Sequence, residues 1–269
     1  MTPERWEGTL LRLFRKPKRG VSVPDNVLQV HNSFLLSAKK ILSTSLFIKH
    51  PEQPQQFLST YYEPLLLYNT RVRTYHPTWT YRIYVPRDFP PTYIQQIVAA
   101  EMEVCVMTCN TQAFEGTFWR FLPLFDTDPE APPFLSCDAD LEITDEEFAA
   151  AEQWLVKTSH PFFHIQIPFL NRFWSISAGR WGARPTELTP QVKNEFFVQL
   201  QQFLHTCNSF GCDELYLQQH IAPAMRSFGV YRFQPYLWTE LVALLVVGLL
   251  ILWLVRKFKP VESQRNRPP

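Results

Sequence analysis

The chain has 269 residues, of which 46% are hydrophobic and 15% aromatic, and its formal net charge is +1. This composition excludes intrinsic disorder for most of the chain, and the length suffices for one domain with a sizeable core. The near-neutral charge argues against attraction of nucleic acid by the protein as a whole. We therefore expect one globular domain with accessory segments and no nucleic acid partner.

The first predicted element is a basic N-terminal arm, residues 1–35. It has a cationic cluster between Arg15 and Arg19 and lacks the long apolar stretch of a signal peptide. We expect a loosely ordered arm or a short amphipathic helix, with the cluster either solvated or in contact with anionic lipid. The globular domain is then expected over residues 36–235.

From Ser43 onward, short strand patterns alternate with helical patterns. The predicted strands are "STSLFIKH", "TYRIYVP", "EVCVMT", "PPFLSCD" and "FFHIQI". The helical patterns between the first four strands are "QQFLSTYYEPLLLYNTR", in which Pro64 is a candidate kink, "PTYIQQIVAAE" and "GTFWRFLPLFD". This order is typical of an α/β fold built on a sheet.

Three further helices are predicted in the second half of the domain. Thr144, followed three residues later by Glu147, is the pattern of a capping box ahead of "FAAAEQWLVK". Another helix is expected from Thr189 to about Cys207, and the last over "DELYLQQHIAPAMR". The whole pattern predicts a doubly wound, mostly parallel sheet, which binds ligands outside the carboxyl ends of its strands.

The C-terminal run from Leu237 to Val255 has 19 residues and one charge, Glu240. At 1.5 Å per residue it reaches about 28 Å, enough to cross a bilayer core, so we predict a transmembrane helix over 237–255. The basic tail 256–269 follows it. With no signal peptide in front, we expect a tail anchor and a cytosolic domain. A lumenal domain stays open, because Arg256 and Lys257 flank the span on its far side.

The five cysteines are odd in number and form no CxxC pair. A disulfide framework or a structural zinc site is therefore not indicated. We expect free, buried thiols in a reducing compartment, with a local pair between Cys105 and Cys109 left open.

Two carboxylates, Asp138 and Asp140, follow the apolar strand pattern "PPFLSC" directly. At a strand end the chain turns, so both can converge on one ligand, and their mutual repulsion then calls for a cation. Mg²⁺ or Mn²⁺, completed by diphosphate oxygens, suits such hard oxygen ligands. The alternative is an exposed turn or a helix cap close to Thr144.

The motifs "TYHPTWTYRIYVP", "GTFWRFLPLFD", "FLSCDADLE", "EEFAAAEQWL", "SAGRWGARP" and "FGCDELYLQQHIAP" occur in an order that is informative as a set. Together they resemble a family of nucleotide-diphospho-sugar transferase-like proteins with the GT-A type glycosyltransferase fold. The resemblance covers about Ser45 to Pro223. It implies a GT-A-like sheet and a nucleotide-diphosphate sugar as donor substrate.

On the donor side, the resemblance implies that Asp138 and Asp140 bind the metal and the donor diphosphate. Arg120 resembles the arginine that faces the nucleotide-sugar. Ser45 and Phe47, at the end of the first strand pattern, would lie near the nucleotide base.

On the acceptor side, the segment with Gly179, Trp181 and Gly182 resembles the loop that receives the acceptor. Asp213 and Glu214 resemble a late acidic pair, one of which acts as general base on an acceptor hydroxyl or contacts the transferred sugar. The acceptor could be a glycan, a lipid or a protein.

The sequence departs from the family at several positions. Cys137 stands where arginine usually precedes the first aspartate, and Leu141 where serine often follows the second. The segment at His164 reads "HIQIPFLN" and lacks the second histidine and the acid of the family pattern. His220 could substitute for a missing late histidine only if its helix turned it inward. These departures put metal affinity and turnover in doubt, while leaving the fold intact.

Ordinary structural roles compete with these assignments. Arg120 could pair with Asp126 or Asp128, and Asp213 and Glu214 could simply be acids at a helix N-terminus. His164 could be a core histidine. Aromatic residues at helical spacing are expected in the core: Trp119, Phe121 and Trp154.

The sequence therefore predicts a membrane-anchored enzyme, a glycosyltransferase of the hexosyltransferase type. It would use a nucleotide-diphosphate sugar and Mn²⁺ or Mg²⁺ at Asp138 and Asp140. The first competing hypothesis is a catalytically degenerate protein of the same fold that serves as a membrane-bound binding or scaffold module. The second is a metal-dependent phosphoester hydrolase, which would need further ligands at other strand ends.

Overall fold

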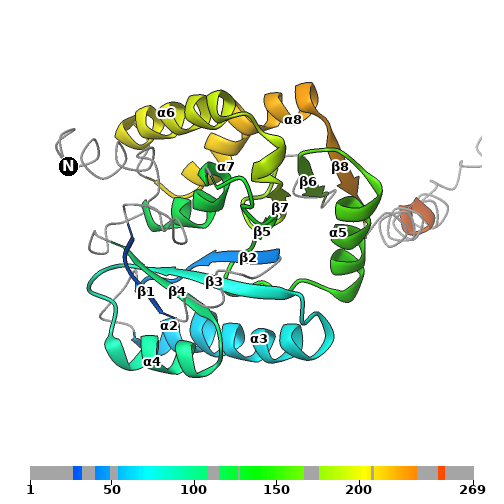
Figure 1. Ribbon diagram of the computed structural model, residues 1–269. Helices are drawn as coiled ribbons and strands as arrows, with labels where there is room; N and C mark the ends of the chain where they lie inside the picture. The colour runs from blue at the N-terminus through cyan, green and yellow to red at the C-terminus, as the bar shows by residue number, and fades with distance from the viewer. Residues whose placement is uncertain are drawn as a thin grey trace, which may run out of the picture.

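The computed structural model describes residues 27–31, 40–48, 54–107, 115–126, 128–166, 176–206, 209–234 and 248–251. Within these residues one sheet has the strand order β1-β4-β3-β2-β5-β7-β6-β8 (Figure 1). Its strands are β1 Val27–His31, β2 Lys40–Ser45, β3 Trp79–Val85, β4 Glu103–Met107, β5 Phe134–Ser136, β6 Phe162–Ile165, β7 Trp181–Ala183 and β8 Val230–Phe233.

Helices cover both faces of the sheet, as Figure 1 shows. One layer contains α2 (Pro54–Phe57), η3 (Leu58–Tyr62), α3 (Glu63–Tyr75) and α4 (Pro91–Ala99). The opposite layer contains η4 (Glu115–Phe125), α6 (Pro190–Thr206), α7 (Cys212–Tyr216), η7 (Leu217–Ile221) and α8 (Ala222–Phe228). The remaining helices are α5 (Asp145–Lys157) and the short η6 (Pro185–Glu187).

The centre of the sheet is parallel and its flanks are mixed. Strands β4, β3, β2 and β5 pair in parallel, and so do β6 and β8. By contrast, β7 is antiparallel to both β5 and β6, and β1 is antiparallel to β4. The prediction of a doubly wound α/β sheet is confirmed for the parallel centre, and β7 and β1 are its exceptions.

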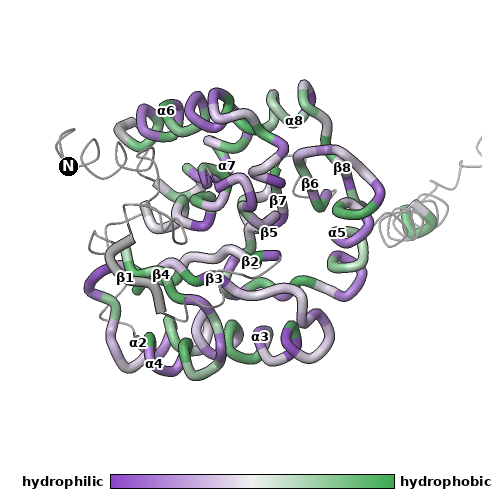
Figure 2. The backbone as a smooth tube through the Cα atoms, viewed as in Figure 1, coloured by the Kyte–Doolittle hydropathy of each residue, from purple (hydrophilic) through white to green (hydrophobic). Residues whose placement is uncertain are grey.

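Successive residues of the central strands alternate between two cores, as the two-residue period of a strand requires. Ile41 and Phe134 pack toward η4, α6 and α7, whereas Leu42 and Leu135 pack toward α3 and α5. The outer helices α3 and α6 alternate between hydrophobic and hydrophilic segments in Figure 2. Because both faces of the sheet are covered, its central strands are buried along most of their length, including polar residues such as Ser43, Arg82 and Glu103.

Two helical runs contain a π-helical turn that ends two residues before a proline. Leu58–Tyr62 precedes Pro64, and Leu217–Ile221 precedes Pro223. A proline inside an α-helix removes one N–H donor and its ring collides with the carbonyl four residues earlier. A π turn inserts an extra residue and lets the helix continue. The predicted kink at Pro64 is therefore a π turn in a helical run from Pro54 to Tyr75.

The structure corrects several predictions of local structure. Residues 27–31, assigned to a loosely ordered arm, form β1 and pair with β4. Strands β7 and β8 were not predicted, because three or four residues carry too short a pattern. The "GTFWRFLPLFD" helix is a 3₁₀ helix that contains Pro123.

The predicted transmembrane helix 237–255 lies mostly outside the described residues, which include only the helical turn 248–251. No helix in the described part of the chain is both long and apolar enough to span a bilayer.

The cysteine prediction holds for two thiols and is wrong for a third. Cys105 and Cys137 are free and buried. Cys212, at the start of α7, is disulfide-bonded. Burial raises the pKa of both free thiols well above its usual value, so neither is an activated nucleophile.

Candidate functional site

The candidate site lies at the point where the strand order of the sheet reverses. From β2 the chain leads through α3 to β3 on one side, whereas β5 pairs with β2 on the other side. Ser43 of β2 is in register with Ser136 of β5, so the carboxyl ends of the two strands lie together. Ligands of open α/β sheets bind in the crevice at such a switch point. Ser45 ends β2, and Asp138 follows β5 by two residues.

A cleft of about 460 Å³ opens at this point. Its walls come from the ends of β2 and β5, from the α2–η3 helix, from η4 and from the start of α7. The lining residues are Ser45, Leu46, Phe47, Gln56, Phe57, Tyr61, Thr117, Arg120, Asp138, Ala139, Asp140, Phe210, Gly211, Asp213 and Glu214. The volume is within the range of small-molecule sites.

Two strand hydroxyls fix the backbone behind the cleft. Ser43 Oγ donates a hydrogen bond of 2.7 Å to the carbonyl oxygen of Arg120, which holds η4 against the end of β2. Ser136 Oγ donates a hydrogen bond of 2.7 Å to the carbonyl oxygen of Ala178, which holds the turn before β7. Both serines are buried, so these hydrogen bonds are shielded from water.

Arg120 is the centre of the charged cluster. Its Nη1 donates to Asp138 Oδ1, and its Nη2 donates to Asp213 Oδ2 at 2.5 Å. Burial lowers the pKa of the guanidinium, but the charges of Asp138 and Asp213 raise it by more, so Arg120 stays positively charged. It therefore connects η4 to the end of β5 and to α7. The sequence analysis also considered Asp126 and Asp128 as partners of Arg120, but the structure pairs Arg120 with Asp138 and Asp213 instead.

The acidic pair Asp213 and Glu214 begins α7, after Gly211 in the left-handed conformation at φ 81°. Burial raises the pKa of Asp213, but Arg120 and a hydrogen bond with Glu214 more than offset it, so the net shift is downward. Burial, then the hydrogen bond with Asp213 and its charge, raise the pKa of Glu214 to about 8. The charge of Asp213 thus favours the protonated form of Glu214.

Asp140 lies at the exposed edge of the cleft. Burial raises the pKa of its carboxyl, and the charge of Asp138 adds to this shift. The phenol of Tyr61 responds to the same acids: burial first, then Asp140 and Asp138, raise the pKa of Tyr61. The two aspartates and Tyr61 therefore share one part of the cleft.

The backbone of Gly179 lies directly against the carboxylate of Asp138. A Cβ at this position would lie 2.1 Å from Asp138 Oδ2, so only glycine lets the carboxylate keep its position. The next residue, Arg180, forms an ion pair with the buried Glu147 at the start of α5. Glu147 also completes the capping box with Thr144, as the sequence predicted. The capped helix α5 therefore fixes the turn that supports Asp138.

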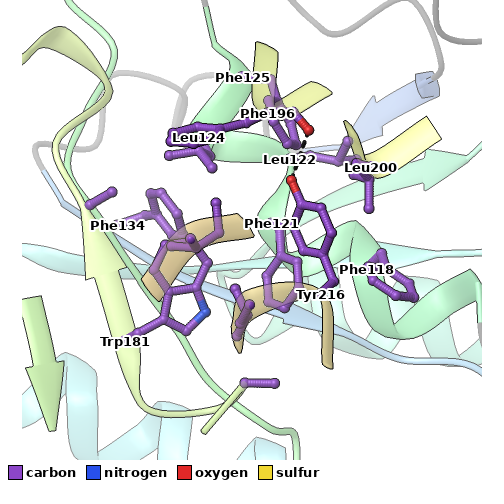
Figure 3. Close-up of a cluster of buried hydrophobic side chains, with 14 of the residues drawn as sticks. Phe118, Phe121, Leu122, Leu124, Phe125, Phe134, Trp181, Phe196, Leu200 and Tyr216 are labelled. Atoms are coloured by element: carbon purple, nitrogen blue, oxygen red, sulfur yellow. Dashed lines mark hydrogen bonds between the residues drawn. The ribbon is translucent and has the colours of Figure 1, made fainter. Parts of the chain in front are cut away.

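The structure brings most of the predicted site residues into this one cleft: Ser45, Phe47, Arg120, Asp138, Asp140, Asp213 and Glu214. Gly179 lies behind Asp138. The predicted substrate-facing position of Trp181 is wrong, because its side chain is fully buried between Phe121 and Phe134, at ring distances of 5.4 and 5.5 Å (Figure 3). Gly182 is likewise a residue of β7, paired with β5.

The two histidines singled out in the sequence, His164 and His220, lie outside the cleft lining. His164 is buried in β6, and burial lowers its pKa to about 4, so it is a neutral core residue. His220 packs against Tyr216 at a ring distance of 5.1 Å. The aromatic residues assigned to the core, Trp119, Phe121 and Trp154, are buried there.

Sequence reasoning missed the two exposed aromatic residues of the cleft, in addition to the buried Phe57. Tyr61 and Phe210 line the cleft with 42% and 89% of their surface exposed. Tyr61 stands in an apolar-periodic helix, where it reads as one more core aromatic. For Phe210 a usable signal exists, since it directly precedes the Gly-Cys-Asp-Glu segment.

The charges of the cleft suit a divalent cation that arrives together with a phosphate ligand. Four carboxyl groups, those of Asp138, Asp140, Asp213 and Glu214, face one guanidinium. Because Asp138 already forms an ion pair with Arg120, the carboxylate of Asp140 is the more available oxygen ligand for a cation. Mg²⁺ is usually held by one or two carboxylates plus substrate phosphates.

No group of three histidine, cysteine, aspartate or glutamate side chains placed to hold a metal occurs among the described residues. The further protein ligands that the hydrolase hypothesis requires are therefore not found among the described residues.

Comparison with known proteins leaves the family open. No family model matches the chain, and no curated protein matches it. Among solved structures, the chain is similar to 4-diphosphocytidyl-2C-methyl-D-erythritol synthase from Anaerococcus prevotii, with 12% identity, a TM-score of 0.42, and coverage of 75% of this chain and 89% of that chain. A TM-score at this level assigns neither a fold family nor an activity.

Proposed function

We propose that the cleft binds a nucleoside diphosphate sugar and transfers the sugar to an acceptor hydroxyl, as a glycosyltransferase does. The observation that carries the proposal is the Arg120 cluster at the β2–β5 switch point. There a buried cation and an exposed carboxylate, Asp140, face the same 460 Å³ cleft. This combination suits a ligand with a diphosphate and a divalent cation.

The residues of the donor side have distinct roles in this proposal. Asp140, assisted by Asp138, would hold Mn²⁺ or Mg²⁺, which offsets the charge of the diphosphate when bound. Arg120 fixes Asp138 and adds positive charge beside the departing diphosphate. The apolar wall of Leu46 and Phe47, at the end of β2, would receive the base.

On the acceptor side, Glu214 is the better candidate for general base. The negative charge of Asp213 is balanced by Arg120. The lowered pKa of Asp213 makes its carboxylate a weak base. A proton acceptor works best with a pKa near the operating pH, which fits Glu214. The acceptor oxygen bonds to the anomeric carbon as the carbon–diphosphate bond breaks. The hydroxyl proton passes to the ionised Glu214 carboxylate, and the nucleoside diphosphate leaves.

The acceptor and the location belong to the same proposal. A glycan, a lipid or a protein could supply the hydroxyl, and the apolar run 237–255 would anchor the chain in a membrane. If the cleft binds donor without turnover, the chain is a binding module of the same fold.

Isothermal titration of the full chain with UDP, GDP, CDP and ADP, each with and without Mn²⁺, tests the proposal. We expect one nucleotide to bind in the micromolar range with Mn²⁺ and Asp140→Asn to weaken it at least tenfold. Glu146→Gln, an exposed acid of α5 outside the cleft, is the matched control. Absence of binding to all four nucleotides under both conditions would refute the proposal.

A further inference from the structure

Tyr61 has a position in the cleft that the proposed function does not use. It belongs to the π turn η3, on the wall opposite the start of α7, and it is half exposed. Its phenol is close enough to Asp140 and Asp138 for both charges to act on it. It is thus the aromatic residue beside the proposed diphosphate position.

The neighbouring residue fixes the direction of Tyr61. Tyr62 is buried, its hydroxyl donates a hydrogen bond of 2.5 Å to Gln96 Oε1, and its ring lies 4.8 Å from that of Tyr93. Because adjacent helical residues point in different directions, anchoring Tyr62 toward α4 leaves Tyr61 to face the cleft. Pro64 follows within the same helical run, and the π turn before it carries both tyrosines.

A neutral donor suits this part of the cleft. A lysine here would be captured by the aspartates, whereas a phenol is uncharged at neutral pH and still donates a strong hydrogen bond. The one guanidinium of the lining is already shared between Asp138 and Asp213. The phenol of Tyr61 is therefore a further donor for phosphate oxygens beside Asp140.

Resting on the proposed function, we infer that Tyr61 is a binding residue that donates its hydroxyl hydrogen to the diphosphate of the donor. This assigns the π turn a purpose, because it holds the phenol at the phosphate end of the ligand. The competing role is a stacking surface for the base, which would need the ring and not the hydroxyl.

The test separates the hydroxyl from the ring. The probes are UDP, uridine and inorganic pyrophosphate with Mn²⁺, with another nucleotide and its nucleoside in place of UDP and uridine if that nucleotide binds best. Tyr61→Phe is compared with the wild type by isothermal titration. Tyr75→Phe, on α3 outside the cleft lining and 68% exposed, is the matched control.

We expect Tyr61→Phe to weaken nucleotide and pyrophosphate binding about tenfold, as loss of a hydrogen bond to a charged group does. Nucleoside binding and the melting temperature should not change, and Tyr75→Phe should resemble the wild type. If Tyr61→Phe binds pyrophosphate and nucleotide as tightly as the wild type, the inference is wrong and the proposed function stands. If the wild type binds no nucleotide at all, the proposed function fails, and the inference fails with it.

Discussion

The guanidinium of Arg120 is buried between two carboxylates, so its removal leaves Asp213 as an uncompensated charge in the protein interior. Breaking a buried ion pair from one side typically costs about 3–5 kcal/mol. We expect Arg120→Met to lower the free energy of unfolding by about that amount, measured by urea denaturation. By contrast, Arg73→Met, which removes an exposed pair with Glu101, should change it by less than about 1 kcal/mol.

A second variant separates stability from binding at the same residue. Arg120→Met combined with Asp213→Asn removes both charges of the buried pair, and we expect it to recover a large part of the lost stability. Both Arg120→Met and the double variant should lack nucleotide binding, because each lacks the positive charge beside the diphosphate. Recovery of binding together with stability would show that Arg120 only supports the fold.

Gly179 can be tested by adding a single methyl group. The Cβ of Gly179→Ala would collide with Asp138 Oδ2 and push the carboxylate away from Arg120. We expect nucleotide affinity to fall at least tenfold in isothermal titration. Gly248→Ala is the matched control, because a Cβ there meets nothing within 4 Å. Equal affinity of the two variants would mean that Asp138 does not bind the ligand.

Glu214 predicts a dependence of stability on pH. Its pKa in the folded chain, about 8, lies above the ordinary value, so folding favours the protonated form. This contribution is complete below the ordinary pKa of glutamate, near 4.5, and is lost as the pH rises through about 8. The groups that face it are Asp213, Arg120 and, in the same cleft, Asp138 and Asp140.

We therefore expect the melting temperature to fall between pH 5 and pH 9, and Glu214→Gln to flatten this fall. Sugar transfer should rise over the same interval in which stability falls, since only the ionised Glu214 accepts a proton. A wild type and a Glu214→Gln variant with parallel stability profiles would contradict the assignment.

At the scale of the element, α5 connects the helix cap to the site. Glu147 Oε2 accepts a hydrogen bond of 2.8 Å from the backbone N–H of Thr144, and Glu147 also pairs with Arg180, next to Gly179. Thr144→Ala removes only the cap and should cost about 1 kcal/mol, with ligand binding unchanged. Glu147→Gln leaves Arg180 without its buried counterion, so it should cost about 3 kcal/mol and also weaken nucleotide binding. Denaturation and titration of the two variants check both effects.

The sequence predicted best the helices and strands that have a long apolar pattern or a proline or capping box at one end. β3, β4, α4 and α5 begin and end close to the predicted positions: Pro86 follows β3, Pro91 opens α4, a capping box opens α5, and β4 is a compact apolar run. β7 and β8 were not predicted, because each is short and pairs with strands that are distant in the sequence. The π turns depend on how a proline is accommodated, which the sequence pattern does not specify.

At the scale of the whole molecule, the candidate site was predictable where strand ends carry polar residues. Asp138 and Asp140 could be placed at the cleft because they follow a buried strand, and Ser45 because it ends another. The pairing of Arg120 with Asp213 could not, since 93 residues separate them and only the packing of η4 on α7 joins them. Trp181 was misplaced because a glycine on either side suggested a loop, whereas the structure has a strand there.

The proposed membrane anchor leads to a prediction about the side of the membrane on which the domain lies. The sequence analysis favoured a cytosolic domain, but Cys212 is disulfide-bonded, and stable disulfides form in oxidising compartments. The cationic residues after the apolar run 237–255 also favour a lumenal domain, because the cationic flank of a membrane span usually remains in the cytosol. In microsomes carrying the full chain, we therefore expect the domain to resist added protease and Cys212 to resist alkylation until a reductant is supplied. A domain that is digested in intact microsomes, with Cys212 alkylated at once, would place it on the cytosolic side.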